Sequence, residues 1–393
     1  MKRCIIVKFF VGVCFVVCLF AGDMFCSFGM AREVQAVASV QVWGGASDIA
    51  SAFAGGDGTK ENPFQISNGS ELARLGMIVN TNYDNARYNN SDVHYCLTSD
   101  IWLNKDNSPM NNWEPIGGGI GFAANFNGRN HSIYGLYVNR SEDWVGLFRH
   151  TNGARIENFA VRSANVRTQG SGGPKAGGIV AMSENSVLSN LIFDGKVLLS
   201  TWAGAGEAGG IVGHKVGGAI INSISLGIIE HSGSVMAVGG IIGGVGWIDT
   251  PIVLNSFFIQ TDTINYGLSF DQWNNAEVIN CYTFDEYMIL SDGRSLVEVA
   301  NSWVKENKEY FETEHGISLT VWGVEYGNIV LGEPNVQEYP DCEEEPTLPE
   351  EECCGESSNR NPSPWIWILL PLLLTSVIGF VCYFILAKRR NSY

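Results

Sequence analysis

Short apolar runs alternate with glycine, asparagine and polar residues at a nearly constant interval through the middle of the chain. A glycine followed by apolar residues recurs at steps of 32, 32 and 30, at Gly146, Gly178, Gly210 and Gly240. Asparagine recurs at steps of 32, 32 and 33, at Asn158, Asn190, Asn222 and Asn255. Repeats of about 20–50 residues indicate a solenoid, a propeller or another stacked array.

One period of this repeat predicts strands. Residues 208–238 hold three β-prone runs, 209–213, 219–224 and 225–229, each too short for a helix. A polar turn is expected between residue 229 and the next glycine pair. Three strands and three corners, stacked on copies of themselves, form a parallel β-helix with an apolar interior. A propeller blade needs about 40 residues or more, which exceeds this period. The sequence therefore predicts an all-β parallel β-helix.

The repeated asparagines and glycines have structural explanations in such a fold. Asparagine tolerates left-handed backbone angles at a corner, and stacked amides can form a hydrogen-bonded ladder. We expect Asn130 and Asn280 to extend the asparagine column. The glycines let the chain turn sharply and let neighbouring turns approach closely. None is followed by the Gly-Lys-Ser/Thr of a phosphate-binding loop.

Two short helices are expected as caps, because the end strands of a solenoid need cover. The first is Glu71 to Asn80, with Ser70 as its N-cap and Leu72 and Leu75 on its apolar side. It lies in the first segment, residues 39–145, together with the first β-helix turns. The repeats proper are expected at residues 146–285.

The second expected helix spans Val299 to Glu314, with Trp303 and Tyr310–Phe311 as buried anchors. Final strands are expected between Thr320 and Leu331. Residues 286–335 are therefore predicted to form a C-terminal cap.

The beginning of the chain has the pattern of a secretory signal peptide, assigned to residues 1–38. Lys2 and Arg3 precede an apolar run from Phe9 to Ala21, and Ala36-Val37-Ala38 offers a small-residue cleavage site. The alternative is a first membrane helix, for which the apolar run is short.

The end of the chain has the pattern of a single membrane helix. Residues 365–386 carry no formal charge over 22 residues, which is long enough to cross a bilayer. Lys388, Arg389 and Arg390 follow, and basic residues favour the cytoplasmic side. We therefore expect a single-pass cell-membrane protein with its ectodomain outside and a basic cytoplasmic tail, residues 387–393.

The expected ectodomain is acidic. Residues 39–364 contain 17 Lys and Arg against 39 Asp and Glu. Such a surface repels nucleic acid and anionic lipid, so these partners are excluded. The acidic residues gather in part at positions 336–364, which we interpret as an extended stalk.

Cysteines are too sparse for a disulfide scaffold. Cys96 and Cys281 lie in the predicted β-helix, and the other ectodomain cysteines are the stalk residues Cys342, Cys353 and Cys354. A disulfide from Cys342 to either of the latter two is a candidate. The remaining thiol would then be available to cross-link two chains.

Enzyme signatures are weak along the chain, and we expect no catalytic, cofactor-binding or metal-binding residues. No His-Glu-x-x-His occurs, and charged residues in the repeats do not recur at matching positions. Asp100, Asp106, Glu114 and Arg129 precede the repeats and are the set that could converge. A β-helical polysaccharide lyase or hydrolase, which needs clustered carboxylates, is thus the alternative function.

Two tryptophans in glycine-rich loops, Trp202 and Trp247, are the candidate ligand-binding residues. Tryptophan stacks on sugars and anchors protein contacts when exposed. The competing explanation for each is packing in the core or in a cap. Exposure in the structure distinguishes the two explanations.

The repeat resembles the GLUG repeat, named for its Gly-Leu-any-Gly core. The third and fourth copies, ending at Gly213 and Gly243, match, whereas Arg149 and Ala181 replace the final glycine in the first two. Residues 58–66, 97–101, 113–117 and 126–136 also look like segments of such proteins. The resemblance implies a right-handed β-helix on a bacterial cell surface. It also implies an adhesin-like role, because these repeats accompany adhesins and some surface metallopeptidases without being catalytic units.

The predicted function is therefore a non-catalytic, surface-anchored β-helical protein that binds a host, matrix or cell-surface protein or glycan. A structural spacer of the cell envelope is a further alternative. No cofactor is expected.

Overall fold

The computed structural model describes residues 40–105, 110–259, 276–284, 288–325 and 327–333. All of them fall within the unit Met1–Asn335. The expected signal peptide, stalk, membrane helix and tail, with Cys342, Cys353 and Cys354, lie outside the described residues. The described helices include none with the length and apolar character needed to cross a membrane.

Strands from successive turns stack in parallel into faces. The first face contains eight strand segments in the described chain, each in register with the next. They are β1 (Phe64–Ile66), β2 (His94–Leu97), β4 (Asn125–Asn127), the beginnings of β9 (Arg155–Thr168) and β12 (Val187–Gly209), β14 (Ala219–Ile221), β18 (Ile252–Leu254) and β20 (Glu277–Ile279).

The second face follows one corner further along each turn. It stacks β3 (Ile101–Trp102), β5 (Ser132–Tyr134), the middle parts of β9 and β12, β15 (Ile224–Ser225), β19 (Phe257–Ile259) and β21 (Tyr282–Phe284).

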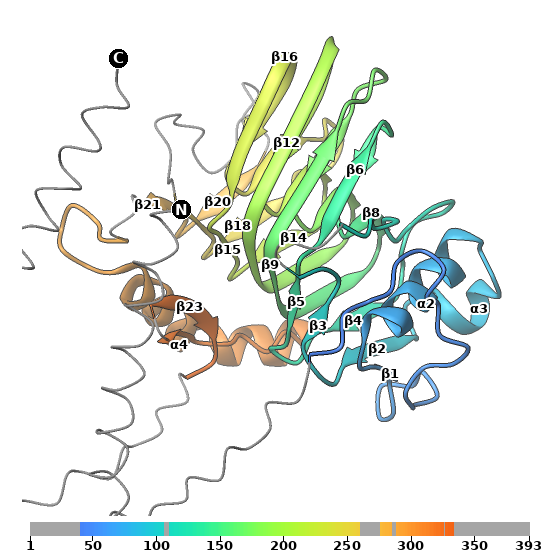
Figure 1. The fold of residues 1–393 in the computed structure, drawn as a ribbon. Helices are drawn as coiled ribbons and strands as arrows, with labels where there is room; N and C mark the ends of the chain where they lie inside the picture. The colour runs from blue at the N-terminus through green and yellow to red at the C-terminus, as the bar shows by residue number, and fades with distance from the viewer. Residues whose placement is uncertain (1–39, 106–109, 260–275, 285–287, 326, 334–393) are drawn as a thin grey trace, which may run out of the picture. The chain divides into compact units, whose positions relative to one another are not determined.

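Beyond the second face, four turns extend outward and return, and we call these extensions the arms (Figure 1). Their outgoing strands are β6 (Tyr137–Arg140), the end of β9, residues 196–201 of β12 and 228–233 of β16 (Ile228–Gly239). Their returning strands are β7 (Trp144–Val145), β10 (Lys175–Gly177) and the last parts of β12 and β16. A third face, a separate sheet, then closes each turn with β8 (Phe148–Asn152), β11 (Val180–Glu184), β13 (Val212–Val216) and β17 (Ile242–Val245).

The prediction of an all-β parallel solenoid is confirmed, and the content of one turn is corrected. A polar turn was expected between residue 229 and the next glycine pair, whereas the arms occupy this part of each period. In the arm of β12, Val197, Leu199 and Thr201 are buried, while the alternate residues point outward. Since this two-residue period is that of a half-buried strand, the arm follows from the local pattern.

The interior is a set of apolar columns, one residue from each turn. On the first face, Phe126, Ile156, Leu188, Ile220 and Val253 occupy matching positions and are each at most 2% exposed. Each such column buries its side chains against both neighbouring turns, so the free energy of burial accumulates turn by turn.

The asparagine column lies at the corner between the first and second faces. Asn158, Asn190, Asn222, Asn255 and Asn280 all have φ between 47° and 61°. Each of the last four donates its amide to the side-chain oxygen of the preceding one, at 2.6–2.7 Å. The corner therefore uses both properties of asparagine, its tolerance of left-handed angles and its stacking amide.

The ladder begins at a residue that the periodicity did not indicate. Asn130 has the corner conformation, with φ of 66°, and donates its backbone N–H to Asn158 O. The Asn158 side chain, however, donates to Asn127 Oδ1 at 3.2 Å. The expected extension to Asn130 is thus wrong for the side chain, because Asn127 reaches the same position from the neighbouring strand.

The repeated glycines permit close approach between parts of a turn. A Cβ at Gly178 would lie 2.2 Å from Gly210 O and 2.4 Å from the Phe193 ring. A Cβ at Gly240 would lie 2.1 Å from Phe258 Cγ. Neither glycine has a positive φ. The chain bends at residues 178–179, 210–211 and 240–241, between the returning strand and the third face, so these glycines lie at a turn separate from the asparagine corner.

The N-terminal helix α2 (Gly69–Asn80) is followed by α3 (Asn85–Tyr88). Leu72, Leu75 and Ile78 of α2 are fully buried, as its apolar side predicts. Its N-cap is Asn68, whose side chain accepts the Glu71 N–H at 3.0 Å, and the prediction of Ser70 is wrong. Glu71 in turn accepts the Ser67 N–H at 2.6 Å, and the helix begins at Gly69, two residues before the expected start at Glu71.

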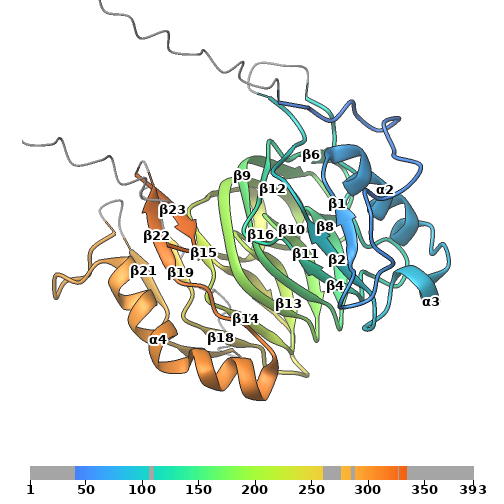
Figure 2. The same cartoon turned by 90° about the horizontal axis from the view of Figure 1, so that it is seen from below.

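The C-terminal elements are α4 (Leu296–His315) and the antiparallel hairpin β22 (Trp322–Glu325) and β23 (Asn328–Leu331). They lie along one side of the stacked strands (Figure 2). Helix α4 packs through Val304 and Phe311 on first-face residues such as Ile221, and Trp322 and Ile329 pack on the second face. The expected terminal cap therefore straddles several turns at the asparagine corner.

The asparagine side chains of the ladder also form hydrogen bonds with this C-terminal segment. Asn190 and Asn222 donate to Ser318 O and Thr320 O, both at 2.8 Å. The Trp322 indole N–H donates to Asn222 Oδ1 at 2.7 Å. Of the expected anchors of α4, Phe311 is 7% exposed and Trp303 half-buried, but Tyr310 is 55% exposed, so that part of the prediction is wrong.

One buried cation lies inside the third face. Lys215 is fully buried and donates from Nζ to Ser186 O at 2.9 Å and to Gly217 O at 2.7 Å. Burial lowers the pKa of Lys215 to about 7 from its ordinary 10.5. Two N–H donors suffice for these two carbonyls, so the neutral amine is well satisfied.

We predict that the ladder is a main source of stability. Asn222→Ala should lower the free energy of unfolding by about 2–4 kcal/mol, because it leaves buried partners unsatisfied and puts alanine at a left-handed corner. Asn222→Gly avoids the backbone strain at the left-handed corner but removes the same side-chain amide. It should therefore lower the free energy of unfolding by a smaller amount. Denaturant unfolding measures both variants. Wild-type stability in Asn222→Gly would contradict a contribution from the ladder.

Lys215 should make stability depend on pH. Between pH 10.5 and 7 the unfolded chain binds a proton that the folded chain does not, so stability falls as the pH falls through this window and levels below pH 7. In Lys215→Met this slope should flatten, with a gain of a few kcal/mol at pH 7. Thermal unfolding from pH 7 to 10 tests this, with Lys308→Met on the exposed side of α4 as the control. Parallel curves for wild type and Lys215→Met would contradict it.

Candidate functional site

The arms carry the first candidate ligand residue. Trp202 follows the outgoing strand of β12 and is 86% exposed. The arm itself is firmly packed, because a Cβ at Gly206 on the returning side would lie 2.6 Å from Thr201 and 2.7 Å from Leu199. Trp202 therefore projects from an arm whose two strands pack closely against each other.

Outward side chains of neighbouring arms form a flat surface beside Trp202, which we call the arm surface. Leu198 lies in register with Arg167 and Glu230, and Ser200 with Ser232. The Ser200 and Ser232 hydroxyls are 2.7 Å apart. A hollow of about 230 Å³ on this surface is lined by Arg167, Thr168, Gln169, Leu198, Leu199, Ser200, Glu230, His231 and Ser232.

The strand geometry fixes the spacing of these groups. Neighbouring strands lie about 4.8 Å apart, and successive outward residues of one strand about 6.7 Å apart. Charged, hydroxyl and amide groups therefore repeat at these intervals across the arm surface. The arm surface combines hydrogen-bonding groups with one exposed aromatic ring.

Trp247 is also exposed, at 71%, and Ile248 beside it is 90% exposed. It follows β17, at the corner where the third face leads into β18. The returning strand of β16 and the whole of β17 separate it along the chain from the arm tips. The two tryptophans thus belong to two different places on the molecule.

A buried ionic cluster fastens the arms to the third face. Glu207 is fully buried, with Oε2 lying 2.8 Å from Lys175 Nζ and 2.5 Å from His214 Nδ1. Burial alone would raise the pKa of Glu207, but the hydrogen bond and charge of His214, with Lys175, bring it below its ordinary value. Its Oε1 has no hydrogen-bond partner among the described residues.

Gly244 makes room for this carboxylate. It occupies the position that His214 and Met182 hold in the preceding turns. A Cβ there would lie 2.5 Å from Glu207 Cδ. Lys175, Glu207 and His214 are separated by up to 39 positions in the chain, and no sequence signal singled them out.

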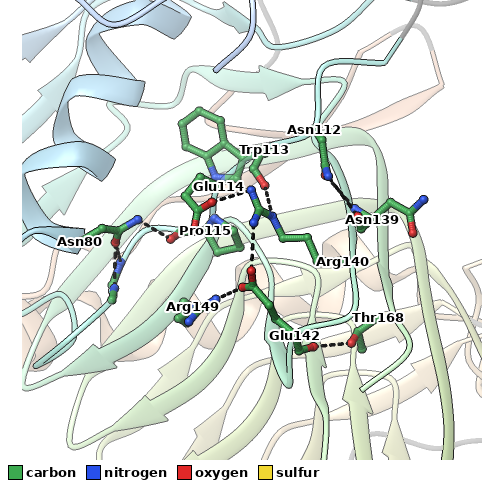
Figure 3. A network of polar contacts seen from close by, with 12 residues as sticks. Asn80, Asn112, Trp113, Glu114, Pro115, Asn139, Arg140, Glu142, Arg149 and Thr168 are labelled. Atoms are coloured by element: carbon green, nitrogen blue, oxygen red, sulfur yellow. Dashed lines mark hydrogen bonds and ion pairs between the residues drawn. The ribbon is translucent and has the colours of Figure 1, made fainter. Parts of the chain in front are cut away.

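The charged residues before the repeats that could converge do not form one cluster in the described part of the chain. Arg140 lies 2.5 Å from Glu114 and 3.0 Å from Glu142, which also pairs with Arg149 (Figure 3). Asp100 instead accepts the Ser132 N–H at 2.9 Å. Asp106 lies outside the described residues. The Glu114 network joins the loop before β4 to the arms and third face, and its carboxylates are paired with arginine.

Asp100 instead shares a groove between the second face and the β22–β23 hairpin with other carboxylates. The groove measures about 630 Å³, and its charged residues are Asp100, Arg162, Asp194, Glu325 and Glu333. Arg162 donates to Ile329 O at 2.7 Å and lies 3.9 Å from Asp194. Burial raises the pKa of Asp194, against the influence of Arg162. The sequence missed this groove because the hairpin folds back over turns formed more than 100 residues earlier.

Within the part of the chain that the structure describes, no three His, Cys, Asp or Glu residues gather as a metal site. Cys96 and Cys281 are free thiols.

No protein-family model matches the chain. It is 36% identical over 120 residues to an Evansella cellulosilytica protein provisionally named Gly-rich membrane protein, covering 30% of this chain and 12% of that protein. It is 33% identical over 168 residues to halomucin of Haloquadratum walsbyi, covering 40% of this chain and 2% of halomucin. The chain thus spans a small part of the length of these relatives.

A crystal structure from Bacteroides ovatus, provisionally described as an immunoglobulin A1 protease, aligns with 71% of this chain and 95% of its own. The TM-score is 0.41 and the sequence identity 18%.

The close contact between Gly244 and the Glu207 carboxylate can be tested by mutation. Gly244→Ala should destabilise the protein by about 1–3 kcal/mol, because the methyl group overlaps the buried carboxylate. In a Glu207→Ala background the same substitution should be nearly neutral. A double-mutant cycle from denaturant unfolding measures the difference. An equal effect in both backgrounds would show that the two residues are independent.

Proposed function

We propose that this protein is a non-catalytic, surface-displayed β-solenoid that binds a saccharide chain of a neighbouring cell or matrix through the arm surface. The observation that carries the proposal is the 86% exposure of Trp202 at the edge of that surface. Tryptophan is enriched at binding interfaces, where its large, amphipathic ring anchors a partner.

The composition of the arm surface supports a saccharide as the partner. Arg167, Gln169, Ser200, Glu230 and Ser232 offer donors and acceptors in a shallow hollow. A saccharide has hydroxyls for such groups and apolar ring faces for an indole. The rigid, hydrogen-bonded arms present these groups without an ordering step, which favours affinity.

A location on the cell surface is part of the proposal. It is supported by the signal-like residues 1–38, by the apolar residues 365–386 and by a relative named as a membrane protein. The ectodomain would lie outside, and the GLUG-like repeats would serve as its binding body. An adhesin-like role follows from a solenoid that presents a long lateral surface.

A carbohydrate-active enzyme is a second candidate, favoured by the carboxylate groove beside Arg162. Paired Asp or Glu residues flank the scissile bond in glycosidases. Asp194, whose pKa burial raises, would be the proton donor in such a reaction. We prefer binding, because Asp100 on this groove is already engaged by the Ser132 N–H.

A glycan array with the full chain tests the proposal, with sugar release assayed in parallel. Trp202→Ala should weaken binding at least tenfold without changing stability, because the ring is exposed. Trp247→Ala, at a separate exposed position, is the matched control and should leave binding unchanged. Binding that is indifferent to Trp202, or lost only with Trp247, would refute the role of the arm surface. Product release abolished by Asp194→Asn would establish the enzyme instead.

A further inference from the structure

A second cavity lies on the first face, away from the arms. It measures about 480 Å³, within the usual range for small-molecule sites. Its lining residues come from the loop after residue 58, from β2, β4 and β9, and from the residue that ends α4. They are Lys60, Pro63, Ser91, His94, Tyr95, Cys96, Asn125, Asn127, Arg129, Arg155, Glu157 and Gly316. We call this cavity the basic pocket.

The charge of the basic pocket is opposite to that of the whole protein. The chain has 41 acidic against 24 basic residues, yet Lys60, Arg129 and Arg155 surround this cavity with Glu157 as its one acidic residue. Burial raises the pKa of Glu157, against the influence of Arg155. Burial and the neighbouring Lys60 lower the pKa of His94. A concave site with this excess of cations concentrates the positive potential.

The three cations differ in how they are held. Arg155 is fixed, because its guanidinium donates to Gly316 O at 2.6 Å and His315 O at 2.9 Å at the end of α4. Lys60 Nζ and the Arg129 guanidinium have no hydrogen bond or ion pair to any other described residue. Both side chains are exposed at the edge of the cavity, whereas the half-buried Arg140 and Lys175 are paired with carboxylates.

The polar groups between the cations are arranged by the strands. Asn125 Nδ2 is bound to Ser91 O at 2.7 Å, and Asn127 Nδ2 to Glu157 Oε1 at 2.8 Å. The Arg129 backbone is held by Asn127 Oδ1 at 2.8 Å. The floor of the pocket is thus preorganised, while the side-chain charges of Lys60 and Arg129 remain available. Such an arrangement suits an oxyanion, which takes charge-assisted hydrogen bonds from arginine and lysine.

We propose that the basic pocket binds an acidic sugar unit through its carboxylate or sulfate group, with Arg129 and Lys60 as its direct partners. The oxyanion follows from the charge of the pocket, and the saccharide part rests on the function proposed above. An acidic polysaccharide would then be held at two separate places, its sugar rings at the arm surface and its charged groups in the basic pocket.

Isothermal titration of the full chain tests this with three probes: oligogalacturonate, sulfated oligogalactose and neutral oligogalactose of the same length. At least one acidic probe should bind more tightly than the neutral one, with an affinity that falls as salt is added. Arg129→Gln and Lys60→Gln should each weaken acidic binding at least fivefold and leave neutral binding unchanged. The preferred acidic probe distinguishes carboxylate from sulfate.

Lys305→Gln is the matched control, because it removes the same charge from an exposed position on α4, roughly 16 Å along the helix from Gly316. Equal affinity for acidic and neutral probes would refute the proposal that the basic pocket binds an oxyanion. A loss of acidic binding in Lys305→Gln as large as that in Arg129→Gln would refute it as well. Trp202→Ala separates the two proposals. Loss of neutral binding in that variant supports the arm surface whatever happens at Arg129, and acidic binding that depends on Arg129 but not on Trp202 supports the pocket alone.

Discussion

Backbone hydrogen bonding between consecutive turns is the interaction on which the rest of this structure depends. Each turn must return the chain to the same position one strand spacing higher, so every corner and strand recurs in register, mostly after 32 residues. Asparagine is required where the corner is left-handed, and glycine where a neighbouring carbonyl or ring leaves no space for a Cβ. The arms are possible because the added residues of one turn pair in parallel with those of the next.

Much of the fold could be read from the sequence because the repeat is regular. The spacing of Asn158, Asn190, Asn222 and Asn255 predicted a column, and identical positions in a stacked fold necessarily lie one above another. Contacts between residues that break the repeat could not be read in this way. Asn127 takes the first place in the ladder from an adjacent strand, and Asn68 replaces Ser70 as the cap because Glu71 binds back to Ser67.

The candidate sites were predicted less well, for the same reason. Trp202 and Trp247 stood out as aromatic residues in glycine-rich loops, and both are exposed. Their separation was invisible, since the arms were taken for a polar turn. The Glu207 cluster, the carboxylate groove and the basic pocket each join residues from different turns or from the C-terminal segment. Their assembly depends on tertiary packing that has no local pattern in the chain.

The C-terminal segment has a consequence for the order in which this protein folds. Its hydrogen bonds reach back 128 residues from Ser318 to Asn190 and 167 residues from Ile329 to Arg162. The outward apolar residues Ala160, Ile192 and Ile224 are covered by this segment, which is synthesised after them. Until the C-terminal segment is synthesised, these residues form an exposed apolar stripe on the stacked turns. Contacts of such long range in sequence also form slowly. A chain truncated before residue 296 would keep its turns but leave these outward apolar residues exposed, and would be prone to aggregation.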